Sequence, residues 1–582
     1  MRMSKIIPGL SFRSTLVLSI LIAQGGCVWF KESKAKLDMG VKPSAHPLAN
    51  SMAFRDTIGS YTFFDGLQGM RVRGYGVVVG LGQNGSAVCP RPIYEPLVKS
   101  LYKQHHFSEA FVGVHSISPE VLIRDLDTAV VLIQGEIPPA ALQGQRFDVS
   151  VSVVPGTQTK SLHGGRLYTA ELLVYRTVSE QVAMTGRPLA RASGPIFFNP
   201  FSEGESATQS NPLSGVIVGG GVVLEDRRVR LVLSEPSYAR ARQIQNRINA
   251  QFPGDQQVAD AVSPSFVRLN VPRAFADDSA HFLSLVRALY LSRDPQFESA
   301  RVRMLASELP DKDAPHEHIA LAFEGIGRTA LPVLNDLYIH PDDHVSFHAA
   351  VGGLRLGEQI ACDAMVMHAR NADGAFRFQA IEALARSKGI SSAAIALRGL
   401  LNDEDPRVRI AAYEALVRRR DAAIQTTVID KDNFALDRVE STAGNLVYVK
   451  RTGRRRIALF GGGTKCVPPI FYRAPDGSLT LNAEPDEETL TALRVAVGRG
   501  VVSEPIQAPL QLHPLITLMG SAADVGTGGD VLGLGLQYGA VVRALYYLSR
   551  DQAMNAEFVL EQPRNDDILS RPRSGGRPES EL

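Results

Sequence analysis

The sequence contains little of several residue types that define common protein classes. Its 582 residues include one tryptophan and four cysteines (Cys27, Cys89, Cys362 and Cys466), which excludes a fold held together by a disulfide framework. The formal net charge is only +2, and no basic block is large enough to form a nucleic-acid track. The motifs H-E-x-x-H, C-x-x-C and G-x-S-x-G are absent. We therefore expect a protein that is not an enzyme, with no cofactor, no metal and no nucleic-acid partner.

Long hydrophobic runs are also missing, and the one marked apolar run lies near the N-terminus. Residues 16–23 (LVLSILIA) follow Arg2, Lys5 and Arg13 and precede a short stretch that ends at Cys27. Eight residues cannot span a bilayer, which needs about 20. A charged start, a short apolar run and small residues indicate an export signal. The pattern resembles a bacterial lipoprotein signal, in which Cys27 would be acylated and would anchor the chain to the outer membrane. An ordinary cleaved signal with an incidental cysteine is the alternative, and both predict export to the periplasm.

The pattern of apolar and polar residues along the chain predicts a multidomain α+β protein in which strand-rich regions flank a helical segment. Residues 146–153 alternate apolar and polar side chains, with Phe147, Val149 and Val151 on one side, as in a strand with one buried face. Residues 237–252 carry apolar side chains at steps of three and four, which indicates an amphipathic helix. The predicted segments are a signal (1–27), a polar tether (28–50), an α+β region (51–275), a helical repeat (276–425), a second α+β region (426–560) and a disordered tail (561–582).

The helical segment contains an internal repeat. The stretches "HAAVGGL" (348–354), "FQAIEAL" (378–384) and "IAAYEAL" (410–416) superimpose with spacings of about 30 residues. A small-residue helix recurring at this interval predicts stacked helix pairs, each too small to bury its own apolar face. The segment resembles HEAT-type repeats, which implies a surface for a protein partner or a spacer.

A glycine-rich stretch, "GYGVVVGLGQNGS" (74–86), raises the question of phosphate binding. A dinucleotide fingerprint needs a third glycine that opens a helix, but Val79 occupies that position and the valines predict a strand. "GGGTK" (461–465) does not supply a P-loop either, because Thr464 and Lys465 stand in reversed order. Glycine within a strand more often marks a bulge or a close approach of two backbones. We expect these glycines to be architectural.

The same stretch resembles the "GYGLVVGL" opening of bacterial flagellar P-ring proteins. Residues 127–173 resemble the central block of that family, including "GQRFDVSV" and "SLHGGRL". After the helical segment, "KRTGRRRIALFGGG" (450–463), "DGSLTLNA" (476–483) and "NAEFVLE" (555–561) resemble its late strands and C-terminus. The resemblance covers about residues 51–300 and 440–560, and the helical repeat is an insertion between the two.

The resemblance implies a structural subunit of a motility organelle. P-ring subunits assemble in the periplasm as a closed ring around the flagellar rod, in the plane of the peptidoglycan, within the basal body. The implied partners are further copies of this chain, the rod and outer-ring proteins, and peptidoglycan. The alternative is a lipid-anchored periplasmic interaction scaffold with a P-ring-like fold that is unrelated to motility.

Five glycines are the candidate ring-contact residues: Gly74, Gly76, Gly80, Gly164 and Gly165. A closed ring needs one face of each subunit to fit the opposite face of the next, and backbone pairing at strand edges suits such a contact. Internal turns and bulges are the competing interpretation for each glycine. Substituting Gly76 by valine separates the two, because a folded monomer that cannot assemble indicates an interface, whereas loss of folding places Gly76 inside the domain.

The remaining chemistry-bearing residues suggest weaker hypotheses. His344 and His348 stand four apart on an expected helix, a spacing that can hold a metal, but a surface or packing pair is the simpler interpretation; the same holds for "HEH" (316–318). Cys89 and Cys466 are the predicted disulfide pair. A peptidoglycan hydrolase is the remote enzyme alternative, and it would use paired acids drawn from Asp125, Asp127, Glu136 and Asp148.

Overall fold

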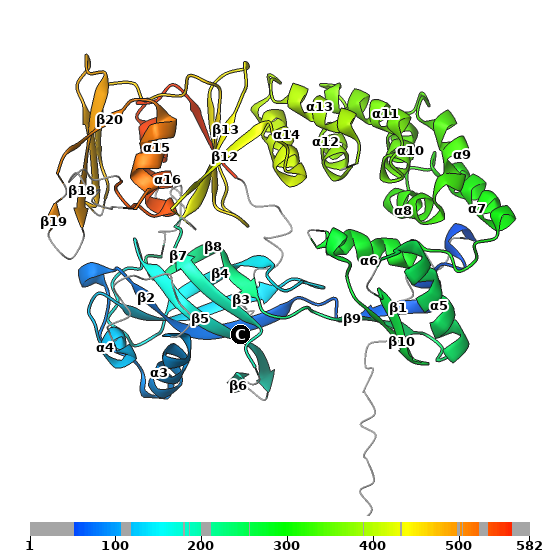
Figure 1. Ribbon diagram of the computed structural model, residues 1–582, viewed down its shortest axis with the longest axis horizontal. Helices are drawn as coiled ribbons and strands as arrows, with labels where there is room; N and C mark the ends of the chain where they lie inside the picture. Colours follow the sequence, from blue (N-terminus) through cyan, green and yellow to red (C-terminus); the bar gives the residue numbers. More distant parts are fainter. Residues whose placement is uncertain are drawn as a thin grey trace, which may run out of the picture. The chain divides into compact units, whose positions relative to one another are not determined.

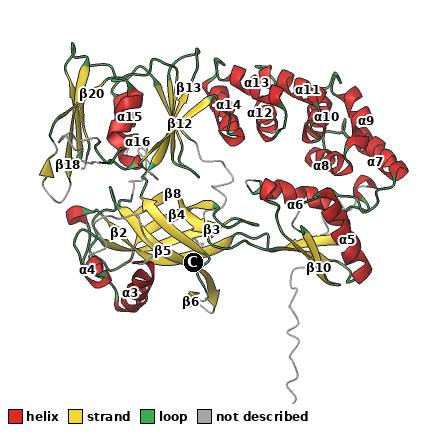
Figure 2. Ribbon diagram, in the orientation of Figure 1, coloured by secondary structure: helices red, strands yellow, loops and turns green. Residues whose placement is uncertain are grey.

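The computed structural model describes the greater part of the chain. The described residues are 52–105, 118–178, 181–184, 187–198, 211–254, 257–276, 278–387, 389–430, 433–475, 477–496, 501–502, 504–522 and 533–561. Along the sequence they form two antiparallel sheets with their helices, a run of helices, and a second strand-rich region (Figures 1 and 2). The expected α+β class is confirmed.

The first large sheet has seven strands and closes on itself. In chain order its strands are β2 (Met70–Val79), β3 (Ala129–Ile137), β4 (Arg146–Val153), β5 (Arg166–Val178), β6 (Gln181–Met184), β7 (Ala190–Pro195) and β8 (Ser214–Val223). Neighbours pair in the order β2-β3-β4-β8-β7-β5-β6, and β2 also pairs with β5. That additional pairing joins six strands into a continuous ring of hydrogen-bonded neighbours, which we call the closed sheet.

The alternation expected for residues 146–153 is present in β4. Phe147, Val149 and Val151 are buried, and they join residues of the other strands in a single apolar cluster. The opposite face is covered in part by α3 (Arg91–His105) and α4 (Pro119–Ile123), which follow the short helix η3 (Gly82–Asn84). Each strand therefore buries one face inside the closed sheet, as a period of two residues requires.

A smaller antiparallel sheet precedes and follows the closed sheet in the sequence. Its strand order is β1-β9-β11-β10. Its strands and the helices around them are α2 (Ile58–Tyr61), β1 (Thr62–Asp65), β9 (Val229–Leu233), α5 (Tyr238–Gln251), β10 (Ala259–Ser263), β11 (Phe266–Leu269), η5 (Arg273–Phe275) and α6 (Ser279–Ala288). The short helix η2 (Met52–Phe54) precedes them and packs into the core of the helical repeat. The helix expected at 237–252 is α5, which Ser237 caps through its side chain and which buries Ala241, Ile244 and Ile248. The whole closed sheet lies between β1 and β9 along the chain.

The helical repeat consists of helices packed in series. They are α7 (Pro295–Glu308), α8 (His316–Ile326), η6 (Arg328–Ala330), α9 (Leu331–Leu337), α10 (Asp343–Arg355), α11 (Gln359–Arg370), α12 (Arg377–Arg386), α13 (Ser391–Leu400) and α14 (Pro406–Arg419). The superimposed stretches lie on α10, α12 and α14, and their leucines Leu354, Leu384 and Leu416 are all buried in one cluster. The first helix after residue 276, α6, packs instead with the four-stranded sheet. The repeat core therefore begins with α7.

The described residues of the second strand-rich region form two sheets and two helices. Its elements are β12 (Ile424–Ile429), β13 (Phe434–Val439), β14 (Leu446–Val449), β15 (Arg456–Phe460), β16 (Ile470–Arg473), β17 (Leu479–Ala483), β18 (Thr489–Ala496), β19 (Val501–Val502), β20 (Ile506–Pro509), α15 (Leu512–Gly520), α16 (Tyr538–Arg550) and β21 (Glu557–Leu560). One sheet has the order β12-β13-β15-β14-β21, and the other is β16-β17-β18-β19 with β20 also on β18. Tyr448 on β14 and Phe460 on β15 belong to the apolar core of the helical repeat.

Candidate functional site

Gly74 and Gly76, two of the candidate ring-contact glycines, lie on the inner face of the closed sheet. They lie on the same face of β2 as Val72 and Val78, which belong to the buried cluster inside that sheet. A Cβ atom at Gly76 would lie 2.9 Å from Ile133 Cδ1 and 3.0 Å from both Ala170 Cβ and Leu167 Cδ1. A Cβ atom at Gly74 would lie 2.2 Å from the carbonyl oxygen of Glu171 on β5. Atoms of the same chain thus fill the space that a side chain at Gly74 or Gly76 would need.

The other three glycines lie at turns near the ends of β2 and β5. Gly80 and Gly164 have φ angles of +80° and +75°, which favour glycine, and neither has an atom within 4 Å of a Cβ position. The amide of Gly80 donates to Asp127. Gly165 lies against Val78 and Leu81 of its own domain. These contacts support the turn interpretation, and a ring contact stays a prediction for all five glycines.

Three of the four acidic residues considered for glycan cleavage accept hydrogen bonds from backbone amides. Asp127 accepts hydrogen bonds from the amides of Gly80 and Gly82, and Asp125 accepts one from the amide of Asp127. Asp148 accepts from the amide of Gly219 at 2.5 Å and from that of Gly453 at 3.2 Å. Glu136 on β3 lies where a Cβ atom of Gly69 would stand. These hydrogen bonds explain Asp125, Asp127 and Asp148 as architectural groups without requiring a substrate.

The bond from Gly453 to Asp148 joins the two P-ring-like stretches of the sequence across the helical repeat. Gly453 lies in the "KRTGRRR" stretch, between β14 and β15, whereas Asp148 lies on β4. On β8, next to Asp148, Gly219 has a φ angle of +59°, and a Cβ atom there would lie 2.1 Å from the carbonyl oxygen of Gly453. Sequence reasoning missed this contact, although the run of glycines at 219–221 could have suggested a close backbone approach.

The structure does not bring Cys89 and Cys466 together. Cys89 packs at the edge of the cluster between α3 and the closed sheet, whereas Cys466 is buried in the core of the second strand-rich region. Both are free thiols, as is the buried Cys362. Burial raises the pKa of Cys466 to about 12, so its thiol is protonated at neutral pH.

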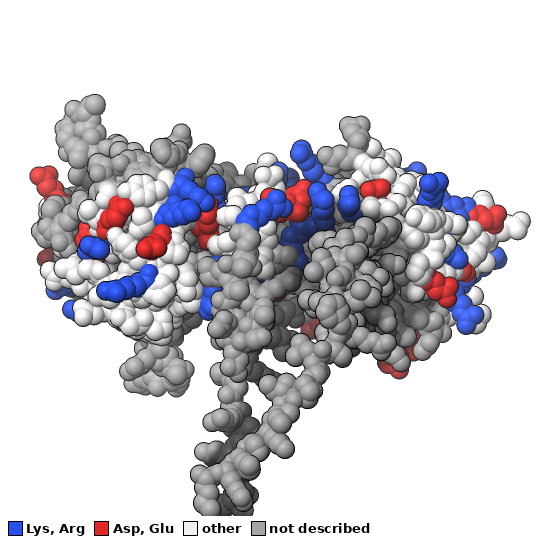
Figure 3. Space-filling view, turned by 90° about the horizontal axis from the view of Figure 1, so that it is seen from below, with Lys and Arg blue, Asp and Glu red and all other residues white. Residues whose placement is uncertain are grey.

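The proposed lipidation site, Cys27, lies outside the described residues, as do the polar tether and residues 562–582 of the predicted tail. Glu561, the first residue of that tail, is described and accepts hydrogen bonds from the amides of Arg451 and Thr452. Among the helices that the structure describes, none combines the length and the apolar character needed to cross a bilayer. On the face shown in Figure 3, acidic and basic side chains are interspersed rather than gathered by sign.

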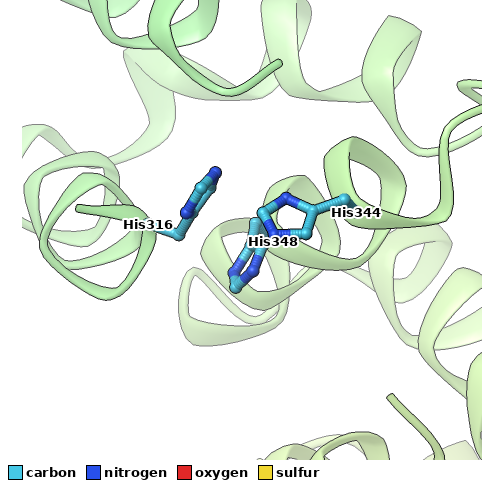
Figure 4. Close-up of side chains that lie close together, drawn as sticks. All are labelled: His316, His344 and His348. Atoms are coloured by element: carbon cyan, nitrogen blue, oxygen red, sulfur yellow. The ribbon is translucent and has the colours of Figure 1, made fainter. Parts of the chain in front are cut away.

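Three histidines from two helices meet in the helical repeat. His344 and His348 lie one turn apart on α10, and His316 lies at the start of α8, so the structure adds a third ring to the pair considered from the sequence (Figure 4). One ligand nitrogen from each ring lies within 4.8 Å of the other two. The ring of His316 stacks on that of His348 with a centroid distance of 4.4 Å. The ring centroids of His316 and His344 are 4.2 Å apart.

The surroundings of His344 and His348 favour the neutral form of these two rings. Burial lowers the pKa of His348 to about 3, with further lowering by the neighbouring histidines and Arg355. Burial and His316 also lower the pKa of His344. Neutral imidazoles have a lone pair that can bind a metal ion. The sequence signal that could have found His316 is weak, because it lies 28 and 32 residues before its two partners.

Comparison with known proteins assigns two parts of the chain. Residues 58–304 match the family model for the flagellar P-ring protein. Residues 368–430 match the model for HEAT repeats. Both resemblances expected from the sequence are confirmed within these bounds, and the first match includes the smaller sheet, the closed sheet and most of α7, the first helix of the repeat.

Individual relatives agree with the first match. The chain is 29% identical over 242 residues to the flagellar P-ring protein of Geobacter metallireducens, 27% over 243 residues to that of Caulobacter vibrioides and 28% over 258 residues to that of Thermotoga maritima. These alignments cover 40%, 40% and 42% of this chain, and 60%, 59% and 69% of the relatives. The chain therefore spans about 60% of the length of the first two relatives.

Proposed function

We propose that this chain is a non-catalytic structural subunit of a flagellar P-ring, assembled as a periplasmic ring around the rod of the basal body. The observation that carries the proposal is the match of residues 58–304 to the P-ring family, which spans a complete closed sheet. The hydrogen bond from Gly453 to Asp148 supports it, because the "KRTG" stretch, which resembles the family's late strand, contacts the matched region. The partners would be further copies of the chain, rod and outer-ring proteins, and peptidoglycan.

The N-terminal segment would deliver and hold the subunit. In this proposal the signal directs export, and acylated Cys27 ties the chain to the outer membrane through the polar tether. Replacing Cys27 by serine would then release the protein from the membrane fraction without unfolding it. A Cys27→Ser variant that stays in the membrane fraction would argue against the lipid anchor while leaving the ring proposal untouched.

The test of the ring proposal is peptide mass spectrometry on purified flagellar basal bodies from the source organism. The expected result is this chain at an abundance that matches other ring proteins. Absence from intact basal bodies, together with abundance in the envelope fraction, would overturn the proposal.

A periplasmic interaction scaffold unrelated to motility is the second candidate. The match of residues 368–430 to HEAT repeats favours it, because such repeats are extended binding surfaces. A strain that lacks the gene separates the two: the P-ring proposal predicts loss of assembled flagella, whereas the scaffold predicts normal flagella and a changed envelope.

A further inference from the structure

We propose that His316, His344 and His348 form a binding site for a divalent transition-metal ion that joins α8 to α10 in the helical repeat. The site is independent of the proposed ring function. Its ligand set is three imidazole nitrogens, and its fourth position would be filled by water, as in open three-histidine zinc sites. The three side chains already converge from two helices in the structure (Figure 4).

The spacing within α10 presents two ligands on one face. Residues four apart on a helix lie one above the other, so His344 and His348 project toward the same neighbour. The side chain of Asp342 caps α10 by accepting from the amide of His344 at 2.9 Å, which positions this first turn. The neighbour that both histidines meet is the start of α8, where His316 is the first helical residue.

The hydrogen bond of His316 orients that ring for metal binding. Its Nε2 lies 3.1 Å from the carbonyl oxygen of Leu309, which can only accept, so Nε2 carries the proton in the neutral ring. The lone pair is then on Nδ1. Metal-binding histidines ordinarily donate their second ring N–H to a carbonyl or carboxylate in this way. The backbone of Leu309 thus fixes the tautomer that a metal ligand needs.

A buried nitrogen without a partner is the second indication. His344 Nδ1 is buried and makes no hydrogen bond to any residue that the structure describes. Leaving a buried polar atom unpaired is unfavourable, and a bound cation would remove that penalty at this atom. His344 packs against Phe376, and His348 packs against both Phe347 and Phe376, but these contacts leave the nitrogen of His344 without a partner.

The ligand chemistry selects the class of ion. Three imidazoles suit Zn²⁺, Ni²⁺, Co²⁺ or Cu²⁺, whereas Mg²⁺ and Ca²⁺ prefer oxygen ligands. Tetrahedral zinc with bonds of about 2.0–2.1 Å would bring its nitrogens to about 3.4 Å apart, so the rings must move closer together than the 4.8 Å limit found here. Lys312 and Arg355 act on these rings as cations and Asp342 as an anion. That balance predicts weaker binding than in a closed cysteine-rich site.

The metal would act as a clamp between neighbouring helices. Because α8 and α10 belong to successive helix pairs, an ion between them binds only the folded stack and stabilises it by mass action. Ile319 and Phe323 of α8 already share a core with Val351 of α10. The clamp would therefore reinforce an existing contact between the two helices.

The experiment adds Co²⁺ to the full chain after chelator treatment, with no polyhistidine tag. We expect one tightly bound equivalent, visible absorption typical of tetrahedral cobalt, displacement of cobalt by Zn²⁺, and a rise in the melting temperature with Zn²⁺. His344→Asn and His348→Gln should each weaken cobalt binding about tenfold or more, since each removes one of three ligands. His368→Asn is the matched control, because His368 is half-buried on the adjacent α11 but lies outside the three-histidine group.

Two results would overturn the proposal. One is a wild-type chain whose spectrum and melting temperature do not respond to Co²⁺ or Zn²⁺. The other is binding that His344→Asn leaves intact while the variant keeps the wild-type circular dichroism, which would place the ion elsewhere. His344 is only partly buried, so this variant keeps the test valid if His348→Gln fails to fold.

Discussion

At the scale of single residues, Gly76 shows how the lack of a side chain determines packing. Two β2 glycines face into the closed sheet, where the side chains of Ile133, Leu167 and Ala170 fill the space that a Cβ atom at Gly76 would take. The neighbouring large apolar residues of β2 on this face, Val72 and Val78, are fully buried. Between them the interior has no room for a further methyl group.

The substitution Gly76→Val should therefore destabilise the domain rather than only block assembly. Overpacking a filled core costs about 1–3 kcal/mol, and we expect a free energy of unfolding lower by at least that amount. Chemical denaturation followed by circular dichroism measures it. Gly254→Val is the control, because Gly254 is exposed and has no atom within 4 Å of a Cβ position. A Gly76→Val monomer of wild-type stability that fails to form rings would instead support the interface hypothesis.

The cysteines offer a second prediction at this scale. Cys89 is partly exposed, whereas Cys362 and Cys466 are buried, and burial raises the pKa of each thiol. Only the thiolate reacts readily with alkylating agents. Iodoacetamide should label Cys89 first and Cys466 much later in the folded chain, as read by peptide mass spectrometry.

The same labelling tests the disulfide hypothesis. If all three thiols are free, unfolding without a reductant should make Cys89, Cys362 and Cys466 fully reactive. A chain in which Cys89 and Cys466 resist labelling until a reductant is added would show that they are paired, contrary to the structure.

At the scale of secondary-structure elements, a buried carboxylate connects the last helix of the repeat to the sheet that follows it. Asp437 on β13 is fully buried and forms an ion pair with Arg456 on β15. It also accepts hydrogen bonds from the hydroxyls of Tyr413 on α14 and Thr426 on β12. Four elements thus converge on one side chain, and each of its partners depends on the same charge.

Replacing Asp437 by alanine should cost about 3–5 kcal/mol, because Arg456 would remain buried without its counter-ion. Thermal and denaturant unfolding measure this loss. The matched control is Asp551→Ala, which removes the half-exposed ion pair with Arg550 and should cost no more than about 1 kcal/mol. Equal losses for the two variants would show that the Asp437 network adds nothing beyond a surface pair.

The helices of the repeat illustrate how local signals set element boundaries. Asp294, Asp342 and Asp405 each cap the helix that follows by accepting backbone amides, and proline begins α7 and α14. These capping signals are readable from the sequence, and the structure agrees with them. The packing of α6 with the four-stranded sheet cannot be read in this way, because it depends on strands that are distant in the sequence.

At the scale of the whole molecule, the inserted repeat separates two stretches that nevertheless touch. Asp148 accepts a hydrogen bond from the amide of Gly219 in its own sheet. It accepts another from the amide of Gly453, which follows the inserted repeat in the sequence. Phe197 and Val218, which come from the first stretch, share a core with the second strand-rich region. The contact therefore combines apolar burial with a charge-assisted hydrogen bond.

Asp148→Ala should loosen this contact while leaving both regions folded. A hydrogen bond to a charged group contributes about 1.5–3 kcal/mol, so amide exchange around Gly453 should accelerate about tenfold or more. Hydrogen exchange with mass spectrometry reports it. Asp226→Ala is the control, because Asp226 accepts only the amide of Gln143 among the bonds described for it. Unchanged exchange around Gly453 in Asp148→Ala would mean that other contacts, such as the apolar core and the hydrogen bond from Arg166 to Gln537, hold the two stretches together.

Much of the architecture follows from local periodicity in the sequence. Alternation in residues 146–153, the apolar stripe of 237–252 and the recurring small-residue helices each predicted an element that the structure contains. These patterns are informative because strand and helix periods depend only on neighbouring residues along the chain.

What the tertiary structure decided depends on residues that are far apart in the sequence. Only the pairing of β2 with β5 closes the sheet and places Gly76 inside it, and only the packing of α8 on α10 brings His316 to His344 and His348. Only docking of distant segments makes Asp148 and Gly453 partners. The local pattern of one sequence does not predict such contacts, because they form only when apolar faces from distant segments pack together on folding.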